Sequence, residues 1–406
     1  MAGTQSKDAE AVAARPHPST TQPKTGCFAQ DAPLLLEFAA SHPDFVPGLE
    51  LSRRFYQEAV RPILDAEYPG LPHSAALIGP GSEVLGFDTP MSADHHWGPR
   101  VMLFLTSEDY DRRRAAIHET LRRRLPHRCE GYPTNFSAPN PDDNGTQLLQ
   151  ATDAGPVNHR VELFTVAGFW LDYLGFDIAR DLEPADWLTF PEQKLCTLTT
   201  GAVYHDGIGL QAVRDRFAYY PRDVWLYLLA AGWARIGQEE HLMGRAGSVG
   251  DEIGSALIGA RLARDLMRLC FLMERQYAPY PKWFGTAFMR LACGPELAPI
   301  LRRAQLAETW QEREQHLCAA YERVAALHNS LGVTAPLPAT VRFFWSRPFR
   351  VIGGERFAKA LCARITDPLV QRIAGRRLIG GMDQFSDSTD LLSDPGWRET
   401  LRGLYA

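Results

Sequence analysis

The sequence lacks the features that mark several large classes of protein. No apolar run reaches the ~20 residues that a membrane-spanning helix needs. The first residues have no hydrophobic segment of the kind found in signal peptides, so nothing indicates export. The seven cysteines are dispersed, and no two form a Cys-x-x-Cys pair. We therefore expect reduced thiols, no structural zinc site, no membrane partner and a cytoplasmic location.

The chain also has little excess of one sign of charge over the other. The formal net charge is -5 over 406 residues, of which 22% are charged and 45% hydrophobic. This balance gives no general attraction to nucleic acid. Two arginine triplets, at 112–114 and 122–124, have no aromatic residues interleaved with them. Because consecutive residues spread around a helix, we interpret these arginines as a solvated surface and expect no nucleic-acid partner.

Composition and periodicity divide the chain into four parts. Residues 1–30 are rich in small and polar residues and predict a disordered arm. Residues 31–72 have apolar side chains at helical spacing and predict N-terminal helices. Residues 73–217 alternate short apolar runs with helical patterns, which predicts a mixed α/β sheet domain. Residues 218–406 predict an all-helical bundle domain.

The longest helix expected in the bundle runs over residues 248–275. Its apolar residues recur at helical spacing, which is typical of an amphipathic helix. The residues on this predicted apolar face are Val249, Ile253, Leu257, Ala260, Ala263, Met267, Cys270 and Phe271.

The stretch from residue 74 to 106 is the one around which the chain is organised. Two apolar runs, at 75–78 and 101–105, predict buried strands, and we expect the second strand to start at an acidic-histidine cluster, Asp94-His95-His96. Gly81 and Ser82 lie in the turn after the first strand. A glycine turn lets backbone N–H groups approach a phosphate closely, and an aspartate at the start of the next strand can hold a divalent cation over it.

A third strand is predicted at residues 160–166, and it contains Glu162. A lone glutamate inside an apolar strand is costly unless it is paired or bound to a metal. The alternative is that Glu162 lies on the solvent face, opposite Val161 and Leu163. Residues 201–206 predict a further strand that ends in a turn at Asp206.

These motifs resemble the nucleotidyltransferase superfamily, which includes DNA polymerase beta and kanamycin nucleotidyltransferase. The family pattern is a Gly-Ser turn, then Asp-x-Asp on a strand, then a third carboxylate on a later strand. Gly81 and Ser82 match the turn. Asp94 and the run 97–100 (Trp-Gly-Pro-Arg) match the second motif as it occurs in a bacterial branch of unassigned function, with His96 where the second aspartate is expected.

The resemblance implies a fold, a reaction and a set of site residues. The fold is a small mixed-sheet domain followed by a helical substrate-binding domain. Asp94, His96 and Glu162 would be the catalytic residues and would hold Mg²⁺ or Mn²⁺, while Gly81 and Ser82 would seat the phosphates. The co-substrate would be a nucleoside triphosphate, with ATP expected, and the acceptor is unknown.

The histidine at position 96 leaves three outcomes open. Imidazole suits Mn²⁺ better than Mg²⁺, so the protein could use another metal. Asp88 or a water could replace the missing carboxylate, or catalysis could be lost while binding is kept. In the helical part, Arg245 and Lys282 are candidates to neutralise a triphosphate, and for each the alternative is helix capping or surface charge.

Three functions follow from this pattern. The leading prediction is metal-dependent transfer of a nucleoside monophosphate from a nucleoside triphosphate to a small-molecule acceptor. The alternative is a degenerate, non-catalytic nucleotide- or ligand-binding protein of the same fold, which His96 favours. A minor alternative is a manganese-dependent phosphoesterase, because the triplet at 94–96 resembles the motif of the phosphoesterases named for Asp-His-His.

Overall fold

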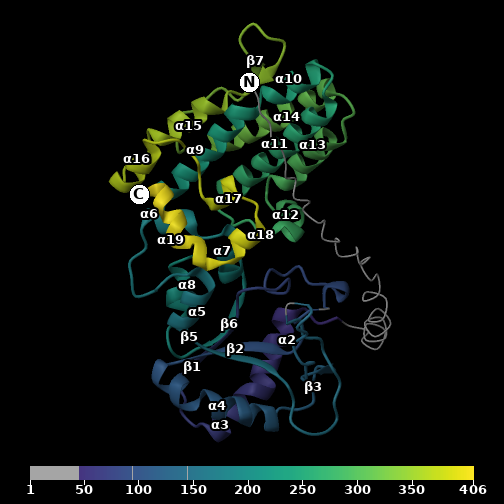
Figure 1. Ribbon diagram of the computed structural model, residues 1–406, viewed down its shortest axis with the longest axis vertical. Coiled ribbons are helices and arrows are strands. Elements are labelled where there is room, and N and C mark those ends of the chain that lie inside the picture. Colours follow the sequence, from purple (N-terminus) through teal and green to yellow (C-terminus); the bar gives the residue numbers. More distant parts are fainter. Residues whose placement is uncertain (1–44, 94, 144) are drawn as a thin grey trace, which may run out of the picture. The chain divides into compact units, whose positions relative to one another are not determined.

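A computed structural model describes residues 45–93, 95–143 and 145–406 (Figure 1). Residues 46–406 form one compact unit, and everything below concerns that unit. The predicted arm at 1–30 lies outside the described residues, as do residues 31–44 of the predicted N-terminal helices and Asp94. The boundary expected between residues 217 and 218 stays a prediction.

The first half of the unit is built around a four-stranded mixed sheet. Its strands stand in the order β5-β2-β1-β6, with β1 antiparallel to both β2 and β6, and with β2 parallel to β5. Every residue of β1 and β2 is buried, as the two apolar runs predicted. The strand bounds are His73–Leu77 for β1, Arg100–Leu105 for β2, Arg160–Thr165 for β5 and Ala202–Asp206 for β6.

Helices cover both faces of this sheet, and Figure 1 shows it between α4 (Ser107–Arg124) and α5 (Val166–Leu174). From α5, the Phe169 ring lies 5.6 Å from that of Phe104 and 5.4 Å from that of Phe164. These two phenylalanines are near the ends of β2 and β5. The starts of both strands, where Arg100 pairs with Arg160, are therefore beyond the aromatic cluster, beside the turn that follows β1.

The remaining elements are helices and two short strand pairs, so the fold is a mixed sheet with a large helical part, as predicted. Before β1 lie α2 (Gly48–Arg54), a π-helical turn (Phe55–Val60) and α3 (Arg61–Glu67). Along the chain, α6 (Pro184–Thr189) and α7 (Glu192–Thr200) precede β6, and α8 (Leu210–Asp215) follows it. The short pairs are β3 (Arg128–Cys129) with β4 (Tyr132–Pro133), and β7 (Arg342–Phe343) with β8 (Arg350–Val351).

The helical part begins at α9 and runs to the end of the chain. Its long helices are α9 (Arg222–Glu239), α11 (Glu252–Met273), α13 (Gly294–Leu306) and α14 (Trp310–Ser330). The shorter ones are α10 (Leu242–Ser248), α12 (Pro281–Phe288), α15 (Gly354–Cys362), α16 (Pro368–Ala374), α17 (Met382–Phe385), α18 (Thr389–Ser393) and α19 (Arg398–Arg402). One hydrophobic core runs through these helices and reaches the sheet at Met102 and Phe104.

The apolar face predicted for α11 is buried only in its second half. Ala263, Cys270 and Phe271 are buried, but Val249 is 82% exposed, Ile253 77% and Leu257 64%. The prediction is therefore wrong for the first half of the helix. The buried residues there are the small Ser255 and Gly259, so apolar periodicity alone pointed to the outward face.

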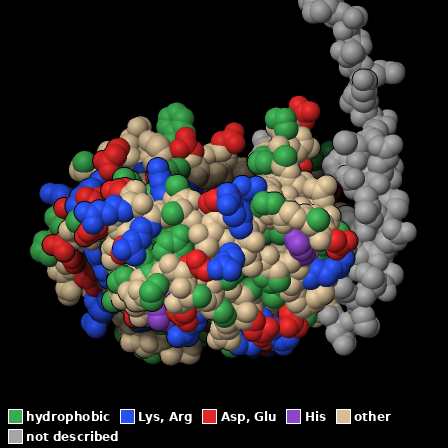
Figure 2. Space-filling model, turned by 90° about the horizontal axis from the view of Figure 1, so that it is seen from below, with side chains coloured by type: hydrophobic (Ala, Val, Ile, Leu, Met, Phe, Trp, Pro, Cys, Tyr) green, Lys and Arg blue, Asp and Glu red, His purple; other side chains and the backbone are tan. Residues whose placement is uncertain are grey.

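Five of the six arginines in the two triplets of α4 pair with carboxylates, and Arg114 contacts Tyr110 instead. Figure 2 shows Lys and Arg side chains interspersed with Asp and Glu over the face seen there. The pairs made by α4 are Arg112 with Glu108, Arg113 with Asp109, Arg122 and Arg123 with Glu119, and Arg124 with Glu67. This pairing agrees with the interpretation of these arginines as a solvated surface.

Two further sequence expectations concern thiols and membranes. The six cysteines within the described residues are free. None of the helices in the described part of the chain combines the length and the hydropathy that crossing a bilayer requires.

The buried carboxyl group of Glu192 on α7 meets the half-buried Asp383 on α17, beside Arg268 of α11. The backbone N–H of Glu192 donates to Asp383 at 2.8 Å, and Arg268 lies 3.4 Å from Glu192. Burial, and then the charge of Asp383, raise the pKa of Glu192 to about 8. Burial also raises the pKa of Asp383.

This pair predicts a loss of stability as pH rises. The folded state holds more protons than the unfolded state above the ordinary glutamate pKa of 4.5, so the free energy of unfolding falls from about pH 4.5 to about pH 8. In Glu192→Gln we expect a flatter profile of Tm against pH. The control is Glu108→Gln, because that carboxylate is 69% exposed. An unchanged slope in Glu192→Gln would contradict the prediction.

Candidate functional site

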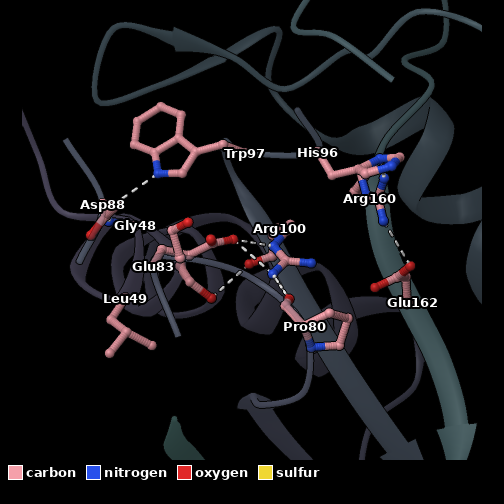
Figure 3. Close-up of polar contacts among 12 residues, drawn as sticks. Gly48, Leu49, Pro80, Glu83, Asp88, His96, Trp97, Arg100, Arg160 and Glu162 are labelled. Atoms are coloured by element: carbon pink, nitrogen blue, oxygen red, sulfur yellow. Dashed lines mark hydrogen bonds and ion pairs between the residues drawn. The ribbon is translucent and has the colours of Figure 1, made fainter. Parts of the chain in front are cut away.

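A buried ion pair clamps the turn after β1. Arg100 Nε donates to Glu83 Oε1 at 2.8 Å, and its Nη2 donates to the Pro80 carbonyl at 2.8 Å (Figure 3). The side chains of Arg100 and Glu83 are each only 7% exposed. Gly81 has φ 146°, and a Cβ there would lie 2.6 Å from both Arg100 Nη2 and Glu83 Oε2. Glycine is therefore required by both the backbone conformation and the space.

The backbone of this turn offers donors. The N–H groups of Gly81 and Ser82 donate to no acceptor among the residues that the structure describes. Both residues are half-buried. Adjacent unpaired N–H groups in a tight turn are the arrangement that binds anions such as phosphate.

The side chain of Ser82 contacts the helical part. Trp283 Nε1 donates to Ser82 Oγ at 3.0 Å, and the Tyr280 hydroxyl lies 3.2 Å from the same oxygen. The Trp283 ring stacks on Phe87 with centroids 5.3 Å apart. Tyr280 and Trp283 thus act as packing groups that join α12 to the turn. Lys282, exposed on the same helix, lies with its Nζ 5.0 Å from the Trp283 ring.

Arg160 stands between His96 and Glu162. Its Nη1 contacts His96 Nδ1, and its Nη2 donates to Glu162 Oε1 at 3.1 Å, as Figure 3 shows. Burial lowers the pKa of His96, and the charges of Arg160 and Arg100 lower it further. Burial also lowers the pKa of Arg160 against the opposing effect of Glu162. His96 is therefore a neutral imidazole at pH 7.

The strand register places Glu162 but not His96 on the sheet. Glu162 pairs with Met102 across β2 and β5, and its side chain is 38% exposed. The expectation that the second strand starts at the acidic-histidine cluster is wrong, because β2 begins at Arg100 and His96 has φ 53°. Alternation along a strand therefore does not decide where His96 points. Asp94 lies outside the described residues.

Two other candidates have different surroundings. Asp88 Oδ2 accepts from the Gly48 N–H at 2.7 Å and from Trp97 Nε1 at 3.0 Å, so this oxygen holds the loop to α2. Arg245 is exposed on α10, which packs against α9, α11 and α14. No contact among the described residues joins Arg245 to the turn at Gly81.

A divalent cation would find only part of its site in these residues. Glu162 Oε2 is a hard oxygen with no partner within the described residues, which fits Mg²⁺ or Mn²⁺. His96 Nδ1 is occupied by Arg160. Residues 45–93, 95–143 and 145–406 contain no group of three His, Cys, Asp or Glu side chains placed to hold a metal. Its other ligands would have to come from outside this set, such as water or the phosphates of a substrate.

A groove runs along the outer strand beside this cluster. Its volume is about 470 Å³, and it is lined by β5 and α4, including Arg114, His118, Asn158, Arg160 and Glu162. Small-molecule sites typically measure roughly 300–1,000 Å³. The groove therefore gives a small molecule room to reach Glu162.

The sequence patterns identified Glu162, but they did not predict its pairing with Arg160 or the separate pair of Arg100 with Glu83. Glu83 and Arg100 are 17 residues apart, and nothing local links them. Arg160 was visible only as a neighbour of Glu162 on the strand. An arginine two residues before a glutamate on one strand shares its face, which was the available signal.

Comparisons with known proteins give one partial match. A family model described as a domain of unknown function (DUF4037) matches residues 187–284, which is about a quarter of the chain. The match spans the segment from α6 to α12, including Arg245 and Lys282, and leaves out Gly81, Ser82 and Glu162. No curated protein and no solved structure matches the chain.

Proposed function

We propose that the chain is a nucleotidyltransferase that moves a nucleoside monophosphate from a nucleoside triphosphate, with ATP expected, to a small-molecule acceptor. The observation that carries this proposal is the half-exposed carboxylate of Glu162, held beside the starts of β2 and β5 in a mixed sheet. The turn at Gly81, with its unpaired N–H groups, follows the neighbouring strand β1. A cytoplasmic location is part of the proposal.

Each residue has a role in this proposal. The N–H groups of Gly81 and Ser82 bind the phosphates, and the pair of Arg100 with Glu83 holds the turn in place. Glu162 and Asp94 hold the Mg²⁺ or Mn²⁺ ion, which when bound would neutralise the leaving pyrophosphate. His96 assists as a neutral imidazole, and Lys282, next to Trp283 on α12, is the candidate to contact the triphosphate. The acceptor binds in the groove beside β5.

A second candidate is a non-catalytic nucleotide- or ligand-binding protein of the same fold. The observation that favours it is Arg160, which contacts both His96 and Glu162. This arginine already supplies the positive charge that a cation would bring. In this case phosphates bind at the turn, and no transfer follows.

One assay separates the two candidates. The protein is incubated with each nucleoside triphosphate and Mg²⁺ or Mn²⁺, with and without cell extract as a source of acceptors, and pyrophosphate is measured. Release of pyrophosphate supports the transferase. A raised Tm with a triphosphate but no pyrophosphate supports binding only, because a ligand stabilises the folded state by mass action. If no triphosphate causes pyrophosphate release or raises the Tm, both candidates are contradicted.

A further inference from the structure

We propose that Cys270 and Cys293 are a redox-sensitive pair that forms a reversible disulfide in the presence of a peroxide. Cys270 lies on α11, and Cys293 is the residue immediately before α13. The two thiol groups hydrogen-bond to each other, although they come from different elements of the fold. Both are free thiols in the structure. Two thiols in side-chain contact are the arrangement from which a disulfide can form.

The backbone at Cys293 is fixed beside the end of α11. Glu274, one helical turn after Cys270, is the C-cap residue of α11, and its Oε1 accepts from the Cys293 N–H at 2.8 Å. The next residue, Gly294, is packed so closely that a Cβ there would collide with the Phe288 carbonyl oxygen. Held on both sides in this way, Cys293 keeps its thiol against that of Cys270.

The two thiols differ in their access to solvent. Cys270 is 0% exposed, whereas Cys293 is half-buried. Contact with the Cys293 thiol, and then burial, raise the pKa of Cys270 well above its usual value. Cys270 is therefore a protonated thiol that a peroxide does not reach, and Cys293 is the residue that reacts with the oxidant first.

The oxidation proceeds in two balanced steps. The Cys293 sulfur attacks one peroxide oxygen, the O–O bond breaks, and the other oxygen leaves as water or an alcohol with the Cys293 proton, so that Cys293 becomes a sulfenic acid. The Cys270 sulfur then attacks the Cys293 sulfur, and the hydroxyl group leaves as water with the Cys270 proton. Two thiols are oxidised and one peroxide is reduced, and a thiol reductant reverses the change. Transient disulfides of this kind are the ones that occur in reducing compartments.

The disulfide would close a loop that contains α12. Residues 271–292 lie between the two cysteines, and they include Trp283, which donates to Ser82 in the turn after β1. Because a closed loop restricts the unfolded chain, we expect the oxidised protein to have a Tm about 4 °C above that of the reduced protein. In Cys293→Ser, the peroxide should leave the Tm unchanged. A lower Tm in the oxidised wild type would show that the bridge distorts the fold, and it would overturn the proposal.

Peptide mapping by mass spectrometry after treatment with hydrogen peroxide tests the pairing itself. In the full chain we expect the loss of two hydrogen atoms and a linked pair of peptides that contain Cys270 and Cys293, and dithiothreitol should reverse both. The matched control is Cys362→Ser, which removes another half-buried cysteine and should leave the linked pair intact. Oxidation of Cys293 to a sulfinic acid while Cys270 stays a free thiol would overturn the proposal, as would a pair that does not react.

Discussion

Replacing Glu162 by glutamine is expected to reduce pyrophosphate release by at least about 100-fold, which is the typical effect of removing one group that stabilises transition-state charge. Glutamine keeps the size of the side chain and can still accept from Arg160. It removes the negative charge and replaces one of the two carboxylate oxygens, which a divalent cation prefers, with an amide nitrogen. The measurement is the rate of pyrophosphate release at saturating triphosphate.

The control for this experiment is Glu108→Gln on α4. Its carboxylate pairs with Arg112 in solvent and lies in no site that we describe. Both variants should keep the wild-type Tm, because Glu162 is 38% exposed. Wild-type turnover in Glu162→Gln would show that this carboxylate takes no part in the reaction.

Replacing Glu83 by alanine is expected to lower the free energy of unfolding by about 3–5 kcal/mol, which is the usual cost of breaking a buried ion pair from one side. The Arg100 guanidinium would be left without its carboxylate in a place where its side chain is only 7% exposed. Of the contacts through which this ion pair holds the turn at Gly81, only the donation from Arg100 to the Pro80 carbonyl would remain. Urea unfolding measures this change.

Two comparisons make the prediction about Glu83 specific. Glu108→Ala breaks a pair whose side chains are 69% and 72% exposed, and it should cost under about 1 kcal/mol. The double variant Glu83→Leu/Arg100→Leu should cost less than the sum of the two single changes, because no charge is left buried. Equal losses of unfolding free energy in Glu83→Ala and Glu108→Ala would contradict the claim that the buried pair of Arg100 with Glu83 stabilises the turn.

The sheet was predictable from the sequence because its signals are local. Strands β1 and β6 end at glycine turns, and β2 and β5 lead directly into α4 and α5, whose N-caps are Thr106 and Thr165. The start of β2 was misplaced because the Asp-His-His cluster lies next to the apolar run. The φ of 53° at His96 takes the chain out of strand geometry there, and the Gly98-Pro99 dipeptide between the cluster and the apolar run was the available signal for this break.

The contacts of the site could not be predicted, because they depend on tertiary packing. The pair of Glu83 with Arg100, and the contact of Arg160 with His96 64 residues away, form only after the sheet is assembled. Similarly, α11 has apolar residues on two sides, and periodicity cannot tell which side a neighbouring helix covers. Burial favoured the side with Ser255 and Gly259, where small residues admit the neighbouring helix.

The most direct test of the proposed site is a crystal structure with a non-hydrolysable nucleoside triphosphate and Mn²⁺. We expect an anomalous manganese peak within about 2.5 Å of a Glu162 carboxylate oxygen, the range of hard cation–oxygen bonds, with the phosphates on the N–H groups of Gly81 and Ser82. A structure with the nucleotide bound at the turn, Arg160 still on Glu162 and no manganese there would contradict the transferase and leave a binding protein.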